Sequence, residues 1–109
     1  MRSISTFLAP ALAAATLCAA NGPVLAQDAA ALRVSALAAT CANCHGTLGR
    51  AVDGAAVPGL AGMPAVYMVE QLKAFKAGTR TATVMHQLAK GYSEPQIDQL
   101  AAYFAAQKK

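Results

Sequence analysis

The stretch Cys41-Ala42-Asn43-Cys44-His45 decides the fold of this chain. It has the form C-x-x-C-H, in which two cysteines three positions apart are followed directly by a histidine. The spacing lets both thiols add to the two vinyl groups of one haem, and it places the histidine imidazole under the iron. We therefore expect Cys41 and Cys44 to attach a single c-type haem, with His45 as the proximal ligand of its iron.

The N-terminal segment has the pattern of a secretory signal peptide. A basic second residue precedes an apolar run, and Val24-Leu25-Ala26 fits a small-residue cleavage site. We expect residues 1–26 to be a cleaved signal peptide and residues 27–109 to form one domain. The apolar run is short and contains Pro10, which argues against an uncleaved anchor. Lipidation at Cys18 is disfavoured because a bulky residue stands where a small one is required.

The mature chain is small and weakly basic. Residues 27–109 carry eight basic and five acidic side chains, an excess too small to indicate a nucleic-acid partner. No membrane span is expected in the mature chain. A domain of this size buries little apolar surface by itself, so a covalently held haem would complete its core. With Cys18 in the signal peptide and two cysteines on the haem, no disulfide framework remains.

The periodicity of apolar residues indicates helices and no sheet. Helices are expected over residues 29–40, 64–77 and 84–90, with a last helix starting at Ser93. The last helix has a capping box, in which Ser93 and Gln96 satisfy each other's backbone amides. The apolar face of the second helix is expected to hold Val66, Val69, Leu72 and Phe75.

A glycine-rich segment, residues 46–62, separates the first two expected helices and shows no apolar period. We expect it to be a loop that wraps one edge of the haem on the side of His45. The second ring nitrogen of a metal-bound histidine needs a partner that fixes the tautomer. A backbone carbonyl of this loop is the natural acceptor, and Pro58 is the candidate.

The opposite face of the iron needs a second axial ligand or stays open. Met63, Met68 and Met85 are the candidates in the mature chain, and Met85 is favoured because it follows a polar loop between two helices. His86 is the rival, and it would lower the reduction potential where a methionine raises it. Neighbouring residues of a helix point about 100° apart, so Met85 and His86 cannot both face the iron.

Several further side chains are candidates for contacts with the haem or with a partner. Arg80 matches a haem propionate through a bidentate guanidinium contact, and Tyr67 through its hydroxyl. The basic residues that would steer an acidic partner are Lys73, Lys76, Arg80 and Lys90.

With the haem motif, three segments carry a family resemblance: Pro58-Gly59-Leu60-Ala61-Gly62, Tyr67–Gly78 and Arg80–Gly91. The chain resembles a class I cytochrome c, and more narrowly the short cytochromes that partner a flavin-containing sulfide dehydrogenase. The resemblance implies a small all-α bundle around one haem, with crossing first and last helices. It also implies Met85 as distal ligand, Pro58 as the acceptor from His45, and a bacterial periplasmic location. Dihaem relatives carry a second C-x-x-C-H, which this sequence lacks.

The favoured function is a periplasmic one-electron carrier with a single c-type haem and His/Met ligation. The alternative is a haem-bearing electron-transfer subunit of a flavin-containing sulfide dehydrogenase. A catalytic or sensing haem with an open sixth position is a third hypothesis, against which Met85 argues. A zinc site would need His86 at a spacing far longer than in finger motifs, and a thioredoxin-like cysteine pair would need a βαβ context.

Overall fold

The computed structural model describes residues 22–109, and the chain divides into two compact units after Leu32. The unit of residues 33–109 holds the haem motif and is the one described below. Most of the expected signal peptide lies outside the described residues, so its cleavage after Ala26 stays a prediction. Within residues 22–109, every helix falls short of the length and apolarity that crossing a bilayer requires.

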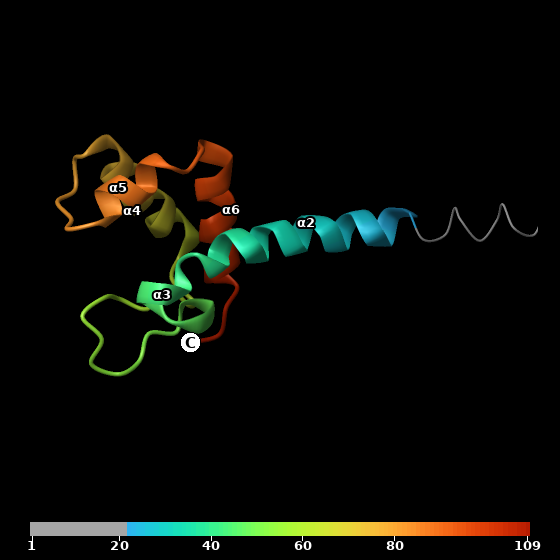
Figure 1. Ribbon diagram of the computed structural model, residues 1–109, viewed down its shortest axis with the longest axis horizontal. Helices are drawn as coiled ribbons and strands as arrows, with labels where there is room; N and C mark the ends of the chain where they lie inside the picture. The colour runs from blue at the N-terminus through green and yellow to red at the C-terminus, as the bar shows by residue number, and fades with distance from the viewer. Residues whose placement is uncertain (1–21) are drawn as a thin grey trace, which may run out of the picture. The chain divides into compact units, whose positions relative to one another are not determined.

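The described chain is helical. Its elements are α2 (Gly22–Ala39), α3 (Ala42–His45), the 3-10 helix η1 (Thr47–Gly49), α4 (Ala65–Ala77), α5 (Met85–Lys90) and α6 (Glu94–Ala105). α4 packs against both α5 and α6, as Figure 1 shows. No strand occurs among residues 22–109, which confirms the expected all-α fold.

Three of the four expected helices begin within a residue of their predicted starts, and the first does not. α2 begins at Gly22 rather than at residue 29. Pro23 suits a first helical turn, since its fixed φ angle and missing amide cost nothing there. The alanine-rich sequence that follows favours helix at every position. The predicted start was late because it assumed that the chain begins after Ala26.

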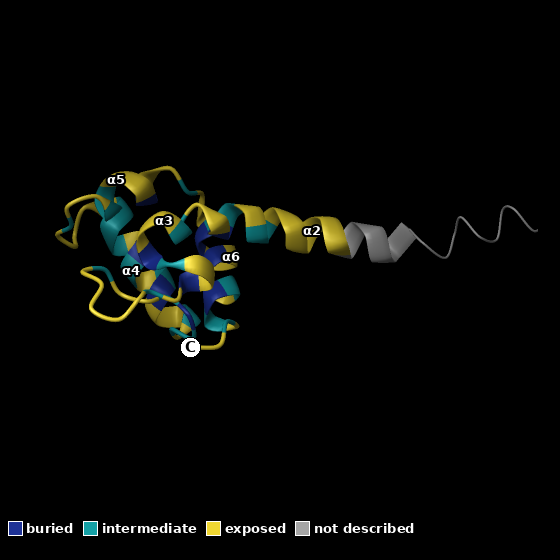
Figure 2. Ribbon diagram, turned by 60° about the horizontal axis from the view of Figure 1, so that its bottom comes forward, coloured by how far each residue is buried: buried dark blue, intermediate teal, exposed yellow. Residues whose placement is uncertain are grey.

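One buried cluster joins three helices of the unit. α2 contributes Ala38, α4 contributes Met68 and Leu72, and α6 contributes all of the remainder. The members from α6 are Ile97, Leu100, Ala101 and Phe104. Figure 2 shows these buried positions in dark blue, facing the inside of the unit. Burial of apolar surface of this kind is the main favourable term in folding.

The apolar face of α4 differs from the expected one at Val66. Val66 is 74% exposed, whereas Leu72 is buried as expected, and Met68 is buried although it was not placed on this face. The expected row advanced in steps of three residues, and such a row drifts by about 60° per step around a helix of 3.6 residues per turn. Met68 and Leu72 are four residues apart and therefore stay on one face. Met68 fills the core, as unbranched methionines commonly do.

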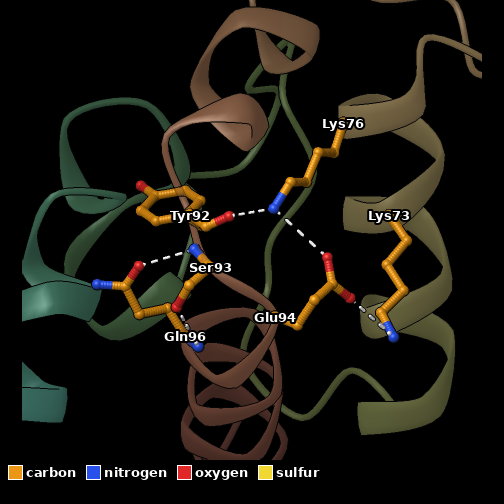
Figure 3. Close-up of polar contacts among 6 residues, drawn as sticks. All are labelled: Lys73, Lys76, Tyr92, Ser93, Glu94 and Gln96. Atoms are coloured by element: carbon orange, nitrogen blue, oxygen red, sulfur yellow. Dashed lines mark hydrogen bonds and ion pairs between the residues drawn. The ribbon is translucent and has the colours of Figure 1, made fainter.

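The start of α6 is the best-defined polar element of the fold (Figure 3). The Ser93 hydroxyl accepts from the Gln96 amide at 3.4 Å, and the Gln96 side chain accepts from the Ser93 amide at 2.9 Å. This reciprocal pair confirms the predicted capping box. Glu94 then pairs with two lysines of α4, Lys73 at 3.1 Å and Lys76 at 3.4 Å. The two lysines share this one carboxylate, so only part of their positive charge is balanced within the domain, and their role in docking stays a prediction.

Candidate haem site

The C-x-x-C-H motif forms its own short helix directly after α2. The Cys41 amide donates to the Ala38 carbonyl at 3.1 Å, and the His45 amide donates to the Cys41 carbonyl at 2.9 Å. Positions three apart on a helical turn lie on the same side, so Cys41 and Cys44 share one side of α3. Cys41 is half-buried and Cys44 is exposed. One helical turn thus presents both cysteines on the same side.

His45 is the only buried charged or polar residue among those described, at 9% exposure. Its Nδ1 lies 2.7 Å from the Pro58 carbonyl oxygen. A carbonyl oxygen only accepts, so Nδ1 carries the ring proton and donates it. In the neutral ring Nε2 then keeps its lone pair for a metal ion. The structure brings these two candidate residues together; their role toward iron stays a prediction.

The turn after His45 requires a glycine. Gly46 has a φ angle of 82°, and a Cβ built on it would lie 1.9 Å from the Arg50 carbonyl oxygen. Farther along, the Leu60 and Ala61 amides both donate to the Gly49 carbonyl, at 2.7 and 3.1 Å. This contact closes the loop onto its own start and sets the position of Pro58, two residues before Leu60.

Met85 and His86 begin α5 and are both partly buried. Met85 packs against the buried cluster. The Nδ1 atom of His86 is buried without a hydrogen-bond partner among the described residues. The His86 ring is therefore partly buried rather than freely solvated. A buried unpaired polar atom costs about 1–3 kcal/mol, so this ring is the polar group of the unit whose hydrogen bonding is least satisfied.

Arg80 and Tyr67, the two candidate propionate contacts, both lie at α4. The Arg80 guanidinium donates to the Gln71 side chain at 2.5 Å and stacks over the Phe75 ring, 4.6 Å from its centroid. Arg80 thus folds back onto α4. Tyr67 stands on the same helix and is 46% exposed.

The residues of the unit fit a haem. The buried His45 ring, with its tautomer fixed, has one nitrogen left to bind iron, and Cys41 and Cys44 lie on the helical turn that leads to it. The domain also leaves large apolar side chains exposed in the segments next to the candidate ligands. After the motif these are Leu48 and Val52, and around Met85 they are Val84 and Leu88, each 40–77% exposed. A flat apolar macrocycle requires surfaces of this kind.

Sequence reasoning overlooked two side chains at the attachment site, Thr40 and Tyr92. Their hydroxyl oxygens lie 3.3 Å apart, beside Cys41. Burial raises the pKa of the Cys41 thiol most strongly, and hydrogen bonding to Thr40 and Tyr92 opposes it. Thr40 adjoins the motif, so its contact was open to prediction. Tyr92 is separated from Thr40 by 52 positions, and only the fold brings them together.

A haem iron takes its remaining ligands from the porphyrin, so it needs no cluster of protein donors. In the part of the chain that the structure describes, no three His, Cys, Asp or Glu side chains gather in a way that would hold a metal ion.

Comparison with known proteins identifies the family. The cytochrome c family model matches residues 31–108. A thiosulfate dehydrogenase electron acceptor from Thiomonas intermedia is 41% identical over 71 residues, covering 65% of this chain and 33% of that protein. A cytochrome subunit of sulfide dehydrogenase from Chlorobaculum tepidum is 41% identical over 68 residues, covering 62% and 60%. Cytochrome c-554(548) from Halomonas halodenitrificans is 36% identical over 72 residues, covering 63% and 86%.

These matches and the helical fold with its C-x-x-C-H motif define the protein as a class I c-type cytochrome. The chain belongs to the cytochrome c family. Family membership implies covalently bound haem c with its iron. The match spans 33% and 60% of the lengths of the first two relatives.

Proposed function

We propose that this chain is a one-electron carrier with one haem c, which works in the bacterial periplasm. The observation that supports the proposal is the buried His45 ring, whose Nδ1 bond to the Pro58 carbonyl leaves Nε2 unprotonated at the end of the helical turn that carries Cys41 and Cys44. The bound haem supplies an iron that cycles between the ferrous and ferric states.

In this proposal each site residue has a separate task. Cys41 and Cys44 would hold the haem through thioether bonds, and Nε2 of His45 would bind the iron. Met85 would supply a second, thioether ligand, which would raise the reduction potential and close the iron to substrates. Tyr67 and Arg80 are proposed to contact the propionates; Arg80 uses one guanidinium nitrogen on Gln71 and keeps further N–H groups for a carboxylate.

A second candidate is a haem-bearing electron-transfer subunit of a flavin-containing sulfide dehydrogenase. It is supported by the similarity to a protein named as the cytochrome subunit of sulfide dehydrogenase. In that case the same haem would receive electrons from a flavin in a stable complex. The partner in either case is a redox protein.

Covalent attachment is tested by expressing the full chain with export and cytochrome maturation. After denaturing electrophoresis, haem staining and intact mass should show one haem on the polypeptide. Cys44→Ala should lose one thioether or fail to mature. Cys18→Ala is the matched control and should keep the full haem content, since residue 18 lies in the expected signal peptide. Haem that is extracted freely by acid acetone would contradict the proposal.

A further inference from the structure

The loop that joins α4 to α5 leads directly into Met85 (Figure 1). At its start the Thr79 and Arg80 amides both donate to the Ala74 carbonyl, at 3.0 and 3.2 Å. In the part of the chain that the structure describes, residues 81–83 take part in no backbone hydrogen bond. The loop is therefore fixed at its start, and the course of its middle follows from that attachment.

The helix α5 does little to fix its own first residue, Met85. It has six residues, far fewer than a helix needs to be stable by itself in water. Its N-cap is Val84, whose side chain makes no capping hydrogen bond and has no oxygen that could accept one. Ala89, near the other end of α5, is fully buried. The first turn of α5 thus relies on the preceding loop for its position.

The side chain of Arg80 attaches this loop to α4. Its guanidinium donates to the Gln71 side-chain oxygen at 2.5 Å and lies over the Phe75 ring, 4.6 Å from the ring centroid. Gln71 and Phe75 are four residues apart and therefore lie on one face of α4. A planar guanidinium can donate in its plane while its face covers a ring, which a lysine ammonium cannot do. Arg80 thus holds the loop through its backbone amide and its side chain together, five residues before Met85.

We propose that Arg80 is a positioning residue for the distal side of the haem: its contacts with Gln71 and Phe75 hold the loop so that Met85 stays available as an axial ligand. This inference rests on the proposed function, in which Met85 is the second axial ligand. Ferric iron prefers harder donors than a thioether, so the bond breaks readily unless the protein holds the sulfur in place. A looser loop raises the population in which an external ligand can replace the sulfur.

The test measures how readily imidazole replaces the distal ligand of the oxidised holoprotein. The apparent Kd for imidazole is read from the Soret band, and loss of the near-infrared sulfur-to-iron band is followed in the same titration. Arg80→Lys keeps the charge and loses the planar contact. It should lower this Kd about fivefold, the ratio that one typical net hydrogen bond sustains. Arg50→Lys is the matched control, because the Arg50 side chain donates to the Lys108 carbonyl, outside the loop, and it should leave the Kd unchanged.

Gln71→Met separates the attachment of the loop from a contact between Arg80 and a propionate. It removes the acceptor on α4 and leaves the arginine free for a carboxylate. It should lower the Kd for imidazole by about the same factor as Arg80→Lys, and the two substitutions together should act less than additively, because they break one contact.

An unchanged Kd in Gln71→Met would overturn the inference and leave the proposed function intact, and this variant decides the matter even where Arg80→Lys fails to mature. An equal fall of the Kd in Arg50→Lys would also overturn it, because general loosening of the fold would then explain the effect. An unaltered holoprotein without the sulfur-to-iron band would overturn the inference together with the role of Met85. An unaltered chain without covalent haem would overturn the proposed function itself.

Discussion

At the scale of single residues, one hydrogen bond prepares the iron site. The Pro58 carbonyl fixes which nitrogen of His45 is protonated, and the loop closure at Gly49 fixes where that carbonyl lies. Both contacts exist in the polypeptide itself. These contacts orient the His45 ring in the way that its proposed role as iron ligand requires.

The distal ligand is tested by a pair of neighbouring substitutions. In the oxidised holoprotein, Met85→Ala should abolish the weak near-infrared band of sulfur-to-iron charge transfer and lower the reduction potential. His86→Ala should keep the band, because adjacent helical residues point in different directions. The opposite pattern, with the native ligand spectrum lost only in His86→Ala, would assign the position to His86.

Gly46 is tested against a second glycine of similar conformation. Gly54 has a φ angle of 78° with nothing within 4 Å of its ideal Cβ, so Gly54→Ala should cost only the left-handed strain, about 1–2 kcal/mol. Gly46→Ala adds a backbone clash with Arg50 and should destabilise the holoprotein clearly more, or prevent its maturation. The free energy of unfolding in urea measures both. Equal losses would show that the turn adapts to a side chain.

Chemistry that is local in the sequence was predictable, and chemistry that depends on contacts between distant residues was not. The motif at residues 41–45 is contiguous, so its spacing alone indicates the haem. The role of Pro58 could be predicted because the second ring nitrogen of His45 needs a carbonyl acceptor in the adjacent loop. Tyr92 lies far from the motif and enters the site only because α6 begins beside the end of α2. The burial of the His86 ring likewise follows from tertiary packing, which no local pattern contains.

At the scale of elements, helix caps were predicted better than helix faces. The Ser93 capping box depends on two residues three positions apart, and it forms as expected. The face of α4 depends on which neighbours cover it, since α5 and α6 both pack there. Val66 is apolar and yet exposed, because apolar residues also occur commonly on protein surfaces.

The link between α4 and α6 predicts a pH dependence of stability. Hydrogen bonding to Lys73, helped by Lys76, lowers the pKa of Glu94 below its ordinary value of 4.5. A lowered folded-state pKa stabilises the fold above the unfolded-state pKa, and this contribution is lost as pH falls below 4.5 through the folded-state pKa. Glu94→Gln should therefore lower the urea midpoint at neutral pH and have little effect well below pH 4.5.

The control for this measurement is Asp98→Asn. Asp98 is an exposed carboxylate of the same helix, and it takes part in neither of the ion pairs found among the described residues. Its substitution should leave the difference between neutral and acidic pH unchanged. If Glu94→Gln and Asp98→Asn behaved alike, the pair of lysines would contribute nothing specific to stability.

At the scale of the whole molecule, docking is expected to be weakly electrostatic. Glu94 neutralises part of the lysine charge on α4, which leaves Arg80 and Lys90 as the main candidates for steering. Exposed charges farther apart than ~10 Å are screened at ~0.1 M salt. Electron transfer with a flavoprotein partner should therefore slow only modestly as salt rises. Transfer that is insensitive to salt, together with co-elution in gel filtration, would favour the stable subunit over the free carrier.

The central claim is that protein side chains fill both axial positions of the haem iron, so that the protein carries electrons and binds no substrate at the iron. Carbon monoxide binds ferrous haem when an axial position is open, so titrating the reduced holoprotein with it tests the claim directly. The account predicts no change in the visible spectrum, with Met85→Ala as the positive control that binds the gas. A carbon monoxide complex formed readily by the unaltered protein would contradict the account and indicate a catalytic or sensing haem.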